Sequence, residues 1–72
     1  MSNAMSRTVA DNVRAEMARR KMSQRALAEA LGVPQPFVYR RLAGRVAFDV
    51  DELAQIARLL DMDPRDLLPA AS

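Results

Sequence analysis

The chain has no cysteine and no histidine, and these two absences exclude several classes of site. Without them the chain has no disulfide framework, no zinc site with His and Cys ligands, no haem held by His, and no catalytic thiol or imidazole. No apolar run is long enough for a transmembrane helix or a signal peptide. One Tyr and two Phe are the only aromatic residues. The core must therefore consist of aliphatic side chains, Ala and Met.

The 72 residues are enough for one small domain and no more. A chain this short buries little apolar area, which favours self-association. Residues 1–4, Met-Ser-Asn-Ala, precede a second methionine, Met5, and resemble the remnant of an expression tag. We therefore expect a single domain over residues 5–72. Because no export signal is present, the expected compartment is the cytoplasm, in association with the nucleoid.

The net charge of +2 hides an uneven distribution. Residues 14–45 carry eight basic side chains against two acidic ones, a net charge of +6, whereas residues 46–72 carry two basic against six acidic ones, a net charge of −4. A strongly basic half favours a polyanionic partner such as nucleic acid. The alternative at this point is an arginine-rich surface that is solvated and has no partner.

The pattern of apolar residues predicts an all-α fold, since no segment alternates with a period of two over the length of a strand. Five short helices are expected: Thr8 to Lys21, Ser23 to Leu31, Gln35 to Gly44, Asp49 to Leu60, and Asp63 to Pro69. Thr8, Ser23, Gln35, Asp49 and Asp63 are the expected N-caps. At the fourth helix the cap belongs to a D-x-x-E capping box.

Three residues predict that the second and third helices form a helix-turn-helix. Ala28 is small enough for the point where two helices cross, Gly32 permits a turn with positive φ, and Val38 can anchor the third helix on the second. The same residues would also pack in an ordinary αα-hairpin of a small bundle. Their spacing alone leaves both interpretations open.

The segment Ser23–Val33, SQRALAEALGV, resembles the "SQxxLAxxLGV" signature of the lambda-repressor-like (Cro/CI-type, XRE) helix-turn-helix family. Residues 50–60 resemble that family's fourth helix, and residues 63–68 resemble its fifth. The resemblance covers residues 9–68 and implies a compact five-helix DNA-binding domain with its motif at about residues 23–43. It also implies double-stranded DNA as the partner.

The resemblance further implies roles for individual residues. Gln24 matches a position that binds a DNA phosphate at the start of a helix. Gln35, Pro36 and Arg40 match positions that enter the major groove, where Gln pairs with adenine and Arg with guanine. Tyr39 lies beside them and is expected to meet a phosphate or a thymine methyl group. Further phosphate contacts are expected from basic side chains around this surface: Arg25, Arg41 and Arg45.

Three residues depart from the family pattern. Pro34 stands where the family usually has a Ser or Thr cap, so the third helix loses a side-chain cap. Pro36 stands where a polar base reader is common and offers only an apolar face, for instance to a thymine methyl group. Leu42 stands where many members have a Glu that pairs with an Arg of the first helix. With Leu at this position that ion pair is absent, and Leu42 is expected to pack. We therefore expect Arg41 to be free for solvent or phosphate.

Together these observations predict a transcriptional regulator, a repressor that binds a pseudo-palindromic operator as a homodimer. The expected interface includes Met62, Leu67 and Leu68, although both leucines could instead close the core. No enzyme activity, cofactor, metal ion, membrane or small-molecule ligand is expected. The acidic residues Asp61, Asp63 and Asp66 lack the spacing of a calcium loop. The alternative functions are a protein-interaction module and the antitoxin of a toxin–antitoxin pair.

Overall fold

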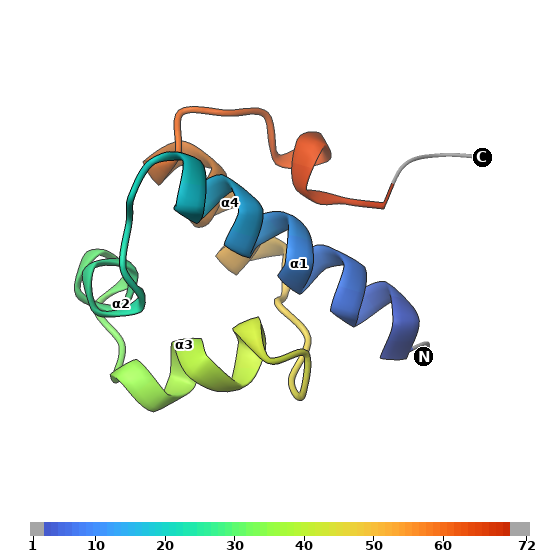
Figure 1. Ribbon diagram of the computed structural model, residues 1–72, viewed down its shortest axis with the longest axis horizontal. Helices are drawn as coiled ribbons and strands as arrows, with labels where there is room; N and C mark the ends of the chain where they lie inside the picture. The colour runs from blue at the N-terminus through green and yellow to red at the C-terminus, as the bar shows by residue number, and fades with distance from the viewer. Residues whose placement is uncertain (1–2, 70–72) are drawn as a thin grey trace.

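The computed structural model describes residues 3–69, and all its regular elements are helical (Figure 1). They are α1 (Asn3–Arg19), α2 (Gln24–Leu31), α3 (Gln35–Leu42), α4 (Val50–Leu59) and the 3₁₀-helix η1 (Pro64–Leu67). The all-α prediction is confirmed, but a fifth α-helix is wrong. Pro64 and Pro69 lie so close together that only one short 3₁₀ turn forms between them.

The prediction that Thr8 caps the first helix is also wrong. The helix α1 begins at Asn3, and Thr8 lies inside it. Its hydroxyl donates a hydrogen bond to the Ala4 carbonyl oxygen at 2.9 Å, which is how a threonine inside a helix satisfies its side chain. No Gly or Pro in residues 3–7 opposes a helix, so the helix extends past Thr8. The origin of residues 1–4 and the domain bounds 5–72 stay predictions.

The core is aliphatic, as the composition predicts, and every element contributes to it. One fully buried side chain comes from each of the five elements: Val13, Leu27, Val38, Ile56 and Leu67. Met17, Leu42, Leu53 and Leu60 are buried with them. The contribution of Leu67 decides one of the open alternatives: this leucine closes the core of the single chain and is not available to a partner.

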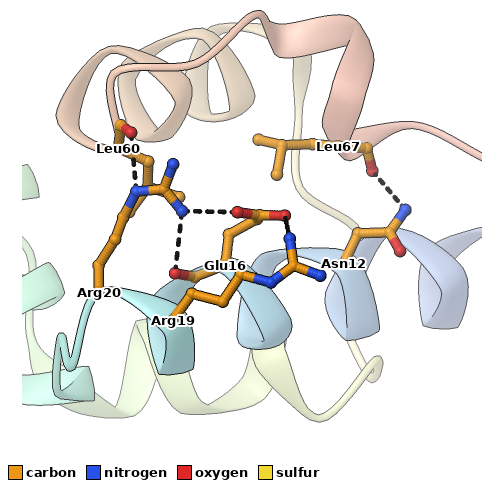
Figure 2. A network of polar contacts seen from close by, with 6 residues as sticks. All are labelled: Asn12, Glu16, Arg19, Arg20, Leu60 and Leu67. Atoms are coloured by element: carbon orange, nitrogen blue, oxygen red, sulfur yellow. Dashed lines mark hydrogen bonds and ion pairs between the residues drawn. The ribbon is translucent and has the colours of Figure 1, made fainter.

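A polar network on α1 holds the C-terminal part of the chain (Figure 2). The Asn12 amide nitrogen donates to the Leu67 carbonyl oxygen at 3.1 Å, and the Arg20 Nε donates to the Leu60 carbonyl oxygen at 2.9 Å. Both acceptors lie near helix ends, where carbonyl groups lack partners within the helix. Glu16 accepts from Arg19 at 2.6 Å and from Arg20 at 2.5 Å. Arg20 therefore ties α1 to the end of α4, whereas Arg19 pairs only within its own helix.

The start of η1 explains the acidic residue directly before it, Asp63. The Asp63 carboxylate accepts from the backbone N–H of Arg65 at 2.9 Å and from the Arg65 guanidinium, also at 2.9 Å. These bonds lower the pKa of Asp63 below its usual value. Because the pKa of Asp63 is lower in the folded chain than in the unfolded chain, these bonds stabilise the fold fully at pH values above the unfolded pKa. This stabilisation is lost as the pH falls through the lowered pKa of the folded chain. Asp63 thus acts as a helix cap.

Candidate nucleic-acid interface

The corner between α2 and α3 sets the direction of α3. The Ser23 hydroxyl caps α2 by accepting from the Ala26 N–H at 3.0 Å. At the other end of α2, Gly32 has φ +71°, and the Val33 N–H donates to the Ala28 carbonyl oxygen at 3.1 Å. These bonds satisfy the last carbonyls of α2 while the chain reverses. Ala28 itself is buried, as is Val38 on α3.

The helix α3 begins one residue earlier than predicted. Pro34, not Gln35, is the N-cap: its backbone is extended, and its carbonyl oxygen accepts from the Phe37 N–H at 3.0 Å. Pro34 makes no side-chain cap bond, as expected for proline. Pro36 then lies in the first turn, where a missing N–H costs nothing. The prolines therefore define the start of α3 without any polar side chain.

The helix α3 divides cleanly into a buried face and an exposed face. Val38 and Leu42 point into the core, whereas the four residues predicted to read bases are exposed: Gln35, Pro36, Tyr39 and Arg40. All of these except Arg40 line one open hollow of about 460 Å³, together with Gln24 from α2. The structure thus brings a residue of α2 next to the outward face of α3.

The basic side chains around this hollow differ in how they are held. Within residues 3–69 neither Arg40 nor Arg45 forms an ion pair, and both are exposed. The Arg45 guanidinium lies 5.9 Å from the centroid of the Tyr39 ring, a cation–π contact. Arg25 pairs with Glu29 at 3.5 Å, but both side chains are exposed, so this pair contributes little and is easily exchanged.

The prediction that Arg41 lacks an acidic partner is wrong. Its Nε donates to the Glu52 carboxylate at 3.0 Å, and both side chains are only 16% exposed. The Arg41 guanidinium also lies 3.4 Å from the centroid of the half-buried Phe37 ring. Arg41 therefore ties α3 to α4 and is a positioning residue; we no longer assign it a phosphate contact.

The partner of Arg41 was missed because its carboxylate has two roles. Glu52 completes the predicted capping box of α4: it accepts from the Asp49 N–H at 2.9 Å, while Asp49 accepts from the Glu52 N–H at 2.7 Å. The D-x-x-E spacing accounts for the cap alone. Only the fold, which brings the Arg41 side chain within reach of the start of α4, reveals that the same oxygen also accepts from an arginine.

One further basic residue was missed, Arg7 on α1. In the sequence the charge of Arg7 is balanced by Asp11, but in the structure Asp11 pairs with Arg14. Arg7 instead lies against Gly44, whose φ is +78° and where an added Cβ would meet the Arg7 Cγ at 3.1 Å. This close approach places an exposed cation beside the C-terminal end of α3.

Comparison with known protein families decides what this arrangement is. The family model described as Cro/C1-type HTH DNA-binding domain matches residues 12–70. The chain belongs to the Cro/C1-type helix-turn-helix DNA-binding family. This confirms the family predicted from residues 23–33. No curated protein matches the chain.

Solved structures show the same fold in this Cro/C1-type domain. The restriction-modification controller protein C.AhdI from Aeromonas hydrophila has a TM-score of 0.83 at 23% identity, over 90% of this chain and 98% of that chain. The DNA-binding domain of BldD has a TM-score of 0.83 at 22% identity, over 96% and 100% of the two chains. Apo-HppE has a TM-score of 0.84 at 26% identity, but the match covers 94% of this chain and only 38% of HppE.

Two other kinds of site were sought in the same part of the chain. Within residues 3–69 no helix has both the length and the apolar character needed to cross a bilayer. Over these residues no three acidic side chains come together in a way that could hold a metal ion.

Proposed function

We propose that this Cro/C1-type domain is a sequence-specific transcriptional regulator that places the outward face of α3 in the major groove of DNA. One observation carries the proposal: the candidate base-reading residues form a continuous exposed face, with unpaired arginines beside it. An α-helix fits the major groove, and arginines neutralise the phosphates that flank it. Repression, by occupying an operator, is the mode of action we propose.

The roles of the residues follow from their positions. Gln35 and Arg40 read base edges through their amide and guanidinium groups. Gln24, at the first turn of α2, binds a phosphate with the help of the backbone N–H groups there. Arg25 and Arg45 bind phosphates, and Arg7 extends this charge beyond the end of α3. Since its partner is the chromosome, the cytoplasm remains the expected compartment.

We also propose a homodimer, whose interface is an apolar patch away from α3. Met5, Val50 and Leu68 are exposed and line one hollow of about 190 Å³ at the start of α1 and α4. Leu68 belonged to the predicted interface, whereas Leu67 is buried and Met62 half-buried. A second copy is the partner that fits, because two half-sites one helical turn apart need two copies of so small a domain.

Replacing Val50 by aspartate is expected to weaken self-association at least tenfold without unfolding the chain. Val50 is 82% exposed, and an acidic residue in the first turn of α4 is compatible with the helix dipole. Sedimentation equilibrium measures the association constant, and circular dichroism gives the unfolding temperature as the control. An unchanged association constant would contradict this interface.

The DNA-binding proposal predicts a steep dependence of affinity on salt. Fluorescence anisotropy with mixed genomic DNA at two salt concentrations should give a log–log slope of about −0.9 for each phosphate neutralised. Three phosphates neutralised by arginines in each copy would give a slope of about −2.7 for one copy and about −5.4 for a dimer. Absence of binding at low salt would contradict the proposal and favour a protein-interaction module.

A further inference from the structure

We infer that the hollow between α2 and α3 reads the C5-methyl group of a thymine; this inference rests on the proposed DNA binding. Its four lining residues, Gln24, Gln35, Pro36 and Tyr39, are all uncharged. Pro36 has no polar side-chain atom, and Tyr39 presents a ring that is 50% exposed. The hollow therefore has a carbon-rich wall on α3 and amide groups beside it.

The distribution of charge favours a base edge as the occupant of this hollow. Arg40 and Arg45, which are exposed and form no ion pair within residues 3–69, come from α3 and from the turn that follows it. Arg25 lies next to Gln24 on α2. Cations at the periphery match the phosphates of a duplex, and the uncharged centre matches the groove floor between them.

Among the base edges in the major groove, thymine alone carries an apolar group, its C5-methyl. A proline ring and a tyrosine ring can remove this methyl group from water, but they cannot form the paired hydrogen bonds that identify adenine or guanine. The Pro36 side chain can form no hydrogen bond with a base, so it contributes to specificity through apolar contact with the methyl group.

The two rings lie on one face of α3 before DNA binds. Pro36 and Tyr39 are three residues apart on α3 and so lie on the same face of the helix. The Arg45 guanidinium lies 5.9 Å from the centroid of the Tyr39 ring, and the Pro36 side chain is fixed by its own ring. The Pro36 ring loses no rotamer freedom on contact, so burial of the methyl group against it is not offset by side-chain ordering.

The test replaces thymine by deoxyuridine, which removes the C5-methyl group and leaves base pairing intact. A duplex is first selected by the protein from a random pool, and each of its thymines is then replaced in turn. At one thymine in each half-site we expect affinity to fall about fourfold, and about fifteenfold when both half-sites are changed. Fluorescence anisotropy measures each dissociation constant.

Variants assign the effect to the two rings. Tyr39→Ala and Pro36→Ala should each reduce the thymine-to-deoxyuridine ratio towards one, whereas Tyr39→Phe, which keeps the ring, should preserve it. Arg25→Ala is the matched control: it should weaken binding to both duplexes equally, because it lies off the hollow and does not contact Tyr39. Such cycles isolate the coupling between one side chain and one methyl group.

Two results would overturn the inference and can be told apart. If the selected duplex is bound but no deoxyuridine replacement changes affinity by as much as twofold, methyl reading is wrong while DNA binding stands. If no duplex is selected and none is bound at low salt, the proposed function and the inference fail together.

Discussion

Replacing Arg40 by alanine is expected to weaken binding to the selected operator by about 1–3 kcal/mol for each half-site. Arg40 lies one turn beyond Pro36 on the exposed face of α3, and no acidic residue within the described part of the chain occupies its guanidinium. A bidentate contact with guanine would be lost with it. Binding to random-sequence DNA should fall far less, by the loss of one positive charge.

Two variants separate base reading from charge at this position. Arg40→Lys keeps the charge but loses the planar fork, so it should behave like Arg40→Ala on the operator and like the unchanged protein on random DNA. Arg25→Ala should weaken binding to the operator and to random DNA by the same factor. It should also make the log–log slope of affinity against salt shallower by about one unit. If Arg40→Ala also lowered both affinities equally, Arg40 would be a phosphate contact.

Replacing Leu67 by alanine is expected to destabilise the fold by about 2–5 kcal/mol. Leu67 is 0% exposed, and its carbonyl oxygen accepts from Asn12 on α1. Its short 3₁₀-helix therefore holds part of the single core. Since small domains have only about 5–15 kcal/mol of stability, this variant should be partly unfolded near body temperature.

The adjacent Leu68 provides the matched control for this prediction. It has the same side chain but is 45% exposed, so Leu68→Ala should change the free energy of unfolding by no more than about 0.5 kcal/mol in the monomer. Urea unfolding, followed by circular dichroism at two protein concentrations, measures both variants and separates the contribution of dimerisation. Equal effects of the two substitutions would contradict the assignment of Leu67 to the core.

The parts of the fold that depend on neighbouring residues were predictable. Ser23 caps α2, and Asp49 with Glu52 caps α4, because capping needs only a polar side chain at a fixed spacing. Gly32 takes the left-handed conformation that its turn requires. The buried faces of α2 and α4 follow from the helical period of their apolar residues.

The errors arose where contacts distant in sequence decide the result, or where the local sequence permits two roles for one residue. Glu52 binds Arg41 eleven residues away, so a cap motif concealed an ion pair. The start of α1 was placed at Thr8 because a threonine can cap a helix or lie within it, and the local sequence fits both. The residues around the hollow were named individually, but their convergence depends on how α2 packs against α3.

The central claim is that the exposed face of α3 contacts the duplex. The most direct measurement is the change in backbone amide chemical shifts of ¹⁵N-labelled protein as the selected duplex is added. The account predicts that the largest changes occur at Gln24, at Gln35, at residues 37–40 and at Arg45, with small changes along α4; Pro36 has no amide proton. Changes concentrated on α4 and η1, with α3 unaffected, would contradict it.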